Sequence, residues 1–128
     1  MLIKRYQLLL VDDSKLAQEA VKSVLADFHC DVVVADSGEQ AIEHCNLMRF
    51  DLILMDLGLT GQNGLKITEL IRDSSLLNKK IPIVALSAHS EVYFFAQIDK
   101  AHLNGFIAKP FSRLKATELM NLLEQHAW

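Results

Sequence analysis

Short runs of almost uninterrupted apolar residues alternate along this chain with longer segments whose apolar residues recur every three or four positions. The short runs are Gln7 to Val11, Asp31 to Ala35, Leu52 to Met55, Ile83 to Leu86 and Gly105 to Ala108. Strands that are apolar at nearly every position are typical of a parallel sheet with helices on both faces. The alternation therefore predicts consecutive βαβ units.

The longer segments predict amphipathic helices. The second of them begins at Ser37, where the sequence has the spacing of a capping box. The others run from about Lys15 to Phe28, from about Gly64 to Asp73, from Ser90 to about His102, and from Ser112 to near His126. The residues expected to face the sheet are Ala17, Ala20, Val21, Val24 and Phe28 in the first helix, Ala41, Ile42 and Cys45 in the second, Ile67, Leu70 and Ile71 in the third, and Ala116, Leu119, Met120 and Leu123 in the last.

Five strands and five helices in strict alternation predict a doubly wound α/β fold, because right-handed crossovers leave few other arrangements. The order that we expect is the flavodoxin-like 2-1-3-4-5. A chain of 128 residues is about the size of one domain, so we expect residues 1–128 to fold as a single unit.

Charge and hydropathy exclude several classes of function. The 13 basic and 16 acidic residues give a net charge of −3, with no basic run longer than Lys79 and Lys80, which argues against nucleic-acid binding. No apolar stretch approaches the length of a membrane span, and no secretion signal opens the chain, so we expect a cytoplasmic protein without membrane contact. Cys30 and Cys45 lack metal-ligand spacing and are expected to be reduced, partly buried thiols.

Polar residues that complement one another follow four of the predicted strands. They are Asp12 and Asp13 after the first strand, Asp56 after the third, Ser87 after the fourth and Lys109 after the fifth. Each alone could be an ordinary helix cap or turn residue. Because ligands bind beyond the carboxyl ends of such strands, however, the five side chains should meet at one edge.

Three carboxylates at one edge repel each other unless a cation neutralises them. Oxygen ligands in a partly filled acidic cluster suit Mg²⁺, which keeps several waters and accepts phosphate oxygens. A phosphoryl group would then meet the metal, the Lys109 ammonium and the Ser87 hydroxyl. One aspartate remains as a nucleophile. Spacing leaves open which one it is, and Asp56 is favoured because it is single on its strand.

At this point the sequence resembles a response-regulator receiver domain, the phospho-accepting module of two-component signalling. The resemblance covers about Tyr6 to Gln125 and rests on LLLVDDS, ADSGEQAI, DLILMDLGLTGQNG, PIVALSAH and GFIAKPF, five motifs in the expected order. PIVALSAH favours a receiver from a hybrid sensor histidine kinase over a stand-alone regulator.

The resemblance implies a role for each residue of the site. Asp56 would be phosphorylated, Asp12 and Asp13 would hold Mg²⁺ with Asp56 and the main-chain carbonyl of Gly58, Ser87 and Lys109 would contact the phosphoryl group, and the Lys109–Pro110 peptide would be cis. Ser87 and Phe106 would form a switch, and Gly58 and His89 would tune the lifetime of the acyl phosphate. Thr60 stands where the family usually has proline, and Phe106 where tyrosine is common.

The implied partners are a histidine kinase or histidine phosphotransfer protein as donor, and a protein that binds the face of helix 4, strand 5 and helix 5. Tyr93, Phe94 and Phe95 sweep a wide arc of helix 4, and Phe94 is our candidate for a partner contact. Two alternatives remain open: a pseudo-receiver that only docks, and a Mg²⁺-dependent phosphohydrolase. Against the hydrolase, Asp12 and Asp13 are adjacent rather than in an Asp-x-Asp pattern. A nucleotide site is disfavoured because no glycine-rich loop follows the first strand.

Overall fold

The computed structural model describes residues 4–58, 64–87 and 103–125. A single parallel sheet has the strand order β2-β1-β3-β4-β5, as the sequence predicts. Its strands are β1 (Tyr6–Val11), β2 (Cys30–Ala35), β3 (Leu52–Asp56), β4 (Ile83–Ser87) and β5 (Gly105–Ala108). The described helices are α1 (Lys15–Ala26), α2 (Gly38–Leu47), α3 (Gly64–Ser74) and α5 (Arg113–Gln125). The helix predicted from Ser90 to His102, with its aromatic triplet, lies outside the described residues.

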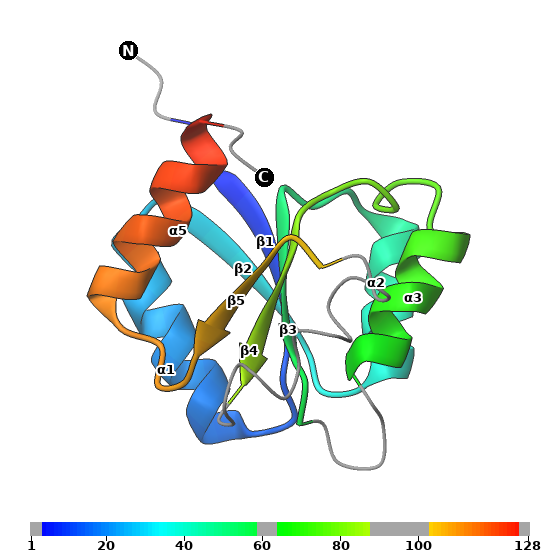
Figure 1. Ribbon diagram of the computed structural model, residues 1–128, viewed down its shortest axis with the longest axis horizontal. Helices are drawn as coiled ribbons and strands as arrows, with labels where there is room; N and C mark the ends of the chain where they lie inside the picture. Colours follow the sequence, from blue (N-terminus) through cyan, green and yellow to red (C-terminus); the bar gives the residue numbers. More distant parts are fainter. Residues whose placement is uncertain (1–3, 59–63, 88–102, 126–128) are drawn as a thin grey trace.

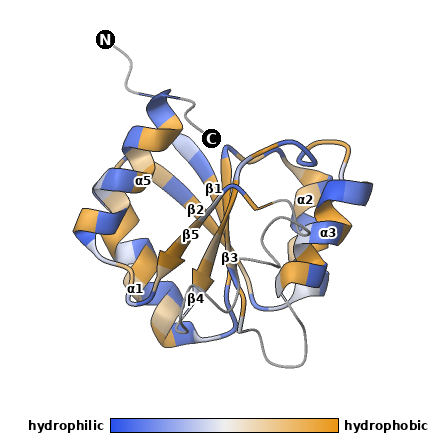
Figure 2. Ribbon diagram, viewed as in Figure 1, coloured by the Kyte–Doolittle hydropathy of each residue, from blue (hydrophilic) through white to orange (hydrophobic). Residues whose placement is uncertain are grey.

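Helices cover both faces of the sheet (Figure 1). Helices α1 and α5 lie on one face, and α2 and α3 lie on the other. Apolar residues follow the strands and the inward sides of the helices (Figure 2). All five residues of β3 are buried, which accounts for the uninterrupted apolar run in the sequence. Cys45 belongs to one core layer and Cys30 to the other, and both are buried free thiols rather than partly buried ones.

Helix α1 differs from its predicted form in two respects. It ends at Ala26 rather than Phe28, because the chain turns through His29, whose φ of 59° is left-handed, and enters β2. Its buried residues are Gln18, Val21 and Leu25, whereas Ala20 is exposed. Val21, Val24 and Phe28 thus pack against the core as predicted, and the prediction for Ala20 is wrong. Leu70 of α3 is likewise on the surface, 40% exposed.

Side chains fix the starts of two helices. Ser14 caps α1 by accepting a hydrogen bond from the Ala17 amide, and Ser37 caps α2 by accepting one from the Gln40 amide. Gln40 does not complete the predicted capping box. Its Oε1 accepts a hydrogen bond from the amide of Asp36, 2.7 Å away, one residue before the cap.

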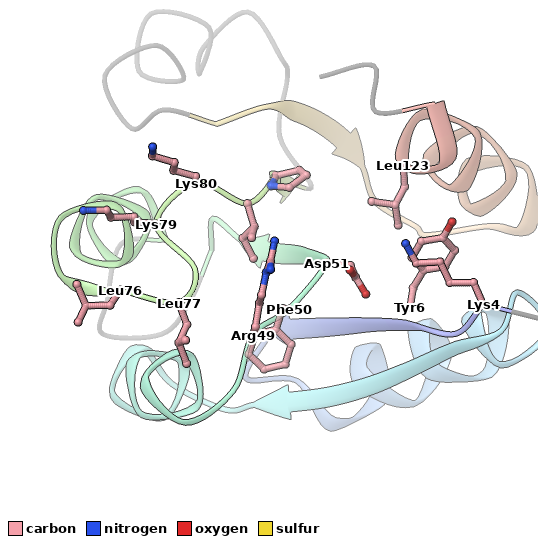
Figure 3. Close-up of a pocket in the computed structure, with 12 residues that line it drawn as sticks. Lys4, Tyr6, Arg49, Phe50, Asp51, Leu76, Leu77, Lys79, Lys80 and Leu123 are labelled. Atoms are coloured by element: carbon pink, nitrogen blue, oxygen red, sulfur yellow. The ribbon is translucent and has the colours of Figure 1, made fainter.

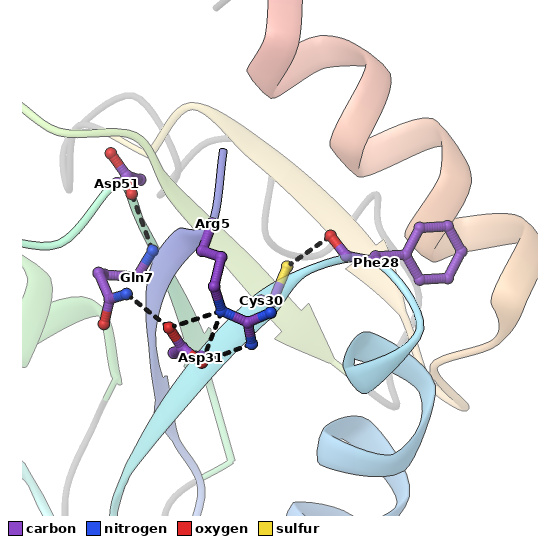
Figure 4. Close-up of polar contacts among 6 residues, drawn as sticks. All are labelled: Arg5, Gln7, Phe28, Cys30, Asp31 and Asp51. Atoms are coloured by element: carbon purple, nitrogen blue, oxygen red, sulfur yellow. Dashed lines mark hydrogen bonds and ion pairs between the residues drawn. The ribbon is translucent and has the colours of Figure 1, made fainter. Parts of the chain in front are cut away.

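A network of polar side chains lies at the amino end of the sheet, where β1 and β2 begin (Figure 4). Asp31 accepts hydrogen bonds from the Arg5 guanidinium and from Gln7 Nε2, and Asp51 accepts one from the Gln7 amide. The Arg5 guanidinium also holds the pKa of Asp31 below its usual range. This network lies at the opposite end of the strands from the predicted site residues.

Candidate functional site

The five predicted site residues all lie at the carboxyl edge of the sheet. Asp12 and Asp13 directly follow β1, Asp56 is the last residue of β3, and Lys109 directly follows β5. The strands end level with one another, since Val11 pairs with Met55 in the register. One carboxylate oxygen from each of Asp12, Asp13 and Asp56 lies within 4.8 Å of the others. The prediction that separate strands bring these three carboxylates together is confirmed.

The chemistry of this cluster fits a hard divalent cation. All of its ligand atoms are carboxylate oxygens, the donor type that Mg²⁺ prefers. Asp12 and Asp56 are buried while Asp13 is exposed, so the cluster opens to solvent on one side. An open acidic cluster leaves room for water and for phosphate oxygens around an ion, as Mg²⁺ requires.

Lys109 bridges the two buried carboxylates. Its Nζ lies 3.3 Å from Asp56 Oδ1 and 3.5 Å from Asp12 Oδ2. Burial nevertheless raises the pKa of Asp12 above its ordinary value, and the nearby charge of Asp56 raises it further. The amide of Ser14, which donates to Asp12 Oδ1 at 2.9 Å, and the Lys109 ammonium both oppose that rise. The site thus holds more negative charge than a single lysine neutralises.

The two oxygens of Asp56 have different surroundings. Oδ1 accepts a hydrogen bond of 2.9 Å from the Gly58 amide in addition to its ion pair with Lys109. Within residues 4–58, 64–87 and 103–125, no such contact engages Oδ2. Among the described residues, Oδ1 is therefore the oxygen that anchors the carboxylate.

Ser87 is the last residue of β4 and is buried. Its carbonyl accepts a hydrogen bond of 2.8 Å from the amide of Lys109, which ties the ends of β4 and β5 together. The Lys109–Pro110 peptide is cis, as the resemblance implies. Phe106 is half-buried and packs against the core layer under α2 and α3. His89 and Thr60 lie outside the described residues, and metal coordination by the Gly58 carbonyl stays a prediction.

Two residues that were not predicted as site residues support the site. Gln18 on α1 is buried, and its Nε2 donates to the Asp12 carbonyl at 2.6 Å and to Asp36 Oδ1 at 2.7 Å. Gly64 opens α3 directly against the backbone of Asp56, so closely that a Cβ atom would overlap the Asp56 carbonyl. A polar residue on the buried face of α1 was the available signal for Gln18, because buried amides need partners.

Together the fold and the acidic cluster define a flavodoxin-like domain with three clustered carboxylates at its carboxyl edge. The family model of the response regulator receiver domain matches residues 8–123. This chain belongs to that family, the receiver domains of two-component signal transduction.

Individual relatives agree with this assignment. The receiver domain of the sensor histidine kinase PA1611 from Pseudomonas aeruginosa PAO1, solved with a magnesium ion in its active site cleft, is 30% identical, with a TM-score of 0.81 over 95% of this chain and 97% of that one. The CAI-1 autoinducer sensor kinase/phosphatase CqsS of Vibrio cholerae is 31% identical over 84% of this chain and 16% of the kinase. The transcriptional regulatory protein DltR of Streptococcus agalactiae is 32% identical over 89% of this chain and 48% of that protein.

The chain thus spans less than half the length of these two curated relatives. Because the relatives include a sensor kinase and a transcriptional regulator, the hybrid-kinase origin stays a prediction. No helix in the described part of the chain is long and apolar enough to cross a bilayer.

Proposed function

We propose that this receiver domain accepts a phosphoryl group on Asp56 from a phosphohistidine protein and loses it by hydrolysis. The observation that carries the proposal is the position of the Asp56 carboxylate: buried, 3.3 Å from the Lys109 ammonium, and clustered with Asp12 and Asp13. An ordinary strand-end aspartate acting only as a helix cap would need neither a partly buried lysine nor two further carboxylates.

In the transfer step, Asp56 Oδ2 attacks the phosphorus of the phosphohistidine. A P–O bond forms as the P–N bond breaks, and the electron pair of the broken bond returns to the imidazole of the donor. The Gly58 amide and Lys109 hold Oδ1, which fixes the plane of the carboxylate during the attack. Hydrolysis later adds water to the phosphorus, releases inorganic phosphate and restores the carboxylate.

We expect the side chains of Lys109 and Ser87 to contact the phosphoryl oxygens, Lys109 through an ion pair and Ser87 through a hydrogen bond. An ammonium already positioned at the reacting carboxylate stabilises the negative charge of the transferring group without further reorganisation. Asp12, Asp13 and Asp56 would hold Mg²⁺, which when bound supplies positive charge to the phosphoryl oxygens. When Asp56 is phosphorylated, Ser87 and Phe106 would change position. Their movement would alter the partner-binding face that includes β5 and α5.

A protein donor needs a surface beside the site. A hollow of about 330 Å³ adjoins Lys109 and lies between α1 and the turn after β5, with Ala17, Ala20, Val21 and Phe111 among its lining. Because Ala20 is exposed, a partner protein can contact the apolar surface of this hollow. Docking here would bring a phosphohistidine to Asp56. The expected donors, a histidine kinase or a phosphotransfer protein, make the cytoplasm the compartment where the domain acts.

Incubation with Mg²⁺ and acetyl phosphate, followed by intact-mass measurement, tests the chemistry. The wild type should gain one phosphoryl group, and Asp56→Asn should gain none. Equal gain in both proteins would refute the assignment of Asp56, and no gain in the wild type would favour a pseudo-receiver. An Ala20→Lys variant separates docking from chemistry, because it should slow transfer from a phosphorylated histidine phosphotransfer domain while leaving acetyl phosphate as effective as before.

A further inference from the structure

A groove of about 630 Å³ opens at the amino end of the sheet, opposite the acidic site (Figure 3). Its lining comes from the start of β1, the segment before β3, the loop between α3 and β4, and Leu123 of α5. Leu76 and Leu77 stand on the loop, 88% and 45% exposed, and Leu123 lies at the far end of the groove. Leu76 and Leu77 therefore offer apolar contact area that the fold itself does not cover.

The charge of this groove is opposite to that of the chain. Lys4, Arg49, Lys79 and Lys80 line it, against the single carboxylate of Asp51, although the net charge of the chain is −3. Asp51 already accepts a hydrogen bond from the Gln7 amide at 2.8 Å.

Among the residues that the structure describes, the basic side chains of the groove form no ion pairs with carboxylates. No ion pair within the described residues engages Arg49, Lys79 or Lys80, whereas Arg5, Lys22, Lys66, Lys109 and Arg113 all pair with carboxylates. Positive charge is thus available to a partner.

The loop that carries the leucines and lysines is held rigidly. Asn78, at its centre, is fully buried; its Nδ2 donates to the carbonyls of Cys45 and Met48, and its Oδ1 accepts from the Phe50 amide, each at 2.8 Å. The Arg72 guanidinium donates to the carbonyls of Lys79 and Ile81. A loop fixed in this way loses little conformational entropy when a partner binds, which favours recognition.

We propose that this groove binds an acidic protein segment that carries an apolar side chain. Acidic residues of the segment would pair with Lys79, Lys80 and Arg49, and its apolar residue would pack against Leu76 and Leu77. A nucleic acid fits less well. The buried Phe50 offers no face for base stacking, Tyr6 is covered by the Lys4 ammonium 4.9 Å from its ring centroid, and exposed leucines add nothing to phosphate contacts. The site is independent of Asp56 chemistry.

A displayed library of random peptides, selected against the intact chain, tests the proposal. Enriched peptides should carry net negative charge and at least one large apolar residue, and their affinity should fall as salt rises. Titration calorimetry should show about tenfold weaker binding to Lys79→Glu/Lys80→Glu. A Leu76→Ser/Leu77→Ser variant should also bind more weakly. Lys22→Glu/Lys66→Glu makes the same charge change on α1 and α3 and should bind like the wild type.

Phosphorylation by acetyl phosphate should proceed normally in the groove variants, which shows that they are folded. If the charge-reversed loop does not fold, Lys79→Gln/Lys80→Gln provides the same comparison with neutral side chains. The proposal is overturned if the enriched peptides are neutral or basic, or if they bind the loop variants and the wild type equally. It is also overturned if a single-stranded oligonucleotide binds the groove more tightly than the selected peptides.

Discussion

Gly64 packs directly against the backbone carbonyl of Asp56, in a space that no Cβ atom can enter. A methyl group at position 64 would meet both that carbonyl and Leu57 Cα, so either α3 or the end of β3 would have to move. We expect Gly64→Ala to lose about 1–3 kcal/mol of unfolding free energy and to phosphorylate slowly. Urea unfolding and the acetyl phosphate reaction measure the two effects.

Gly58 supplies the matched control. A Cβ atom there would lie 3.5 Å from Asp56 Oδ1, an ordinary van der Waals distance. Gly58→Ala should therefore change stability by no more than about 0.5 kcal/mol. Equal destabilisation by the two substitutions would show that the close packing of Gly64 is not what holds Asp56 in place.

The sequence predicts the fold well because the strands are almost wholly apolar and the crossovers have one hand. It predicts the site because the carboxyl ends of parallel strands must meet at one edge. It fails where a residue's role depends on a distant partner. The amide of Gln18 reaches Asp36 across 18 positions, and Asn78 bonds Cys45 across 33. Periodicity also predicted that Ala20 of α1 faces the sheet, because alanine is apolar, whereas Ala20 is exposed.

Removing the charge of Lys109 should separate its two effects. Lys109→Met leaves the buried Asp12 and Asp56 without their cation, so stability without metal should fall by about 2 kcal/mol. Affinity for Mg²⁺ should rise by roughly threefold or more, because the lysine no longer competes for the same carboxylates. The rate of phosphorylation should nevertheless fall by about a hundredfold. Urea unfolding, Mg²⁺ titration and stopped reactions measure these quantities.

Lys66→Met provides the control for that substitution, since Lys66 is exposed on α3 and forms a surface ion pair with Glu69. It should alter none of the three quantities appreciably. A fall in Mg²⁺ affinity on removing Lys109 would mean that the lysine organises the carboxylates rather than competing for them.

The raised pKa of Asp12 makes stability without metal depend on pH in a defined direction. Folded Asp12 binds a proton at a higher pH than the unfolded chain does, so its carboxylate destabilises the fold above the raised pKa. As the pH falls from that value towards 3.8, this cost disappears. Asp12→Asn should therefore be more stable than the wild type at pH 7 in the presence of a chelator, and the difference should shrink as the pH is lowered towards 4.

Affinity for Mg²⁺ should fall over the same pH range, because the ion needs the ionised carboxylate. Unfolding with urea at several pH values and Mg²⁺ titration at the same values check both expectations. A stability difference that grows on acidification would contradict a raised pKa.

The buried side-chain amide of Asn78 links the loop between α3 and β4 to α2 and to the segment before β3, and its loss should be costly. Asn78→Ala removes two hydrogen bonds to the carbonyls of Cys45 and Met48 and one from the Phe50 amide. At about 1 kcal/mol for each bond, the variant should lose about 3 kcal/mol of unfolding free energy. Ser75→Ala removes one bond from the neighbouring hydroxyl to the Cys45 carbonyl and another from the Asn78 amide to that hydroxyl, so its loss should be smaller.

These two substitutions also discriminate between local and global roles of the loop. The acidic cluster is at the other end of the sheet, so Mg²⁺ affinity at a temperature where Asn78→Ala is folded should equal that of the wild type. Amide exchange should accelerate in the loop between α3 and β4 and at the end of α2, where the lost bonds were made. Acceleration spread evenly over β1 and α5 as well would mean that Asn78 stabilises the whole domain rather than this junction.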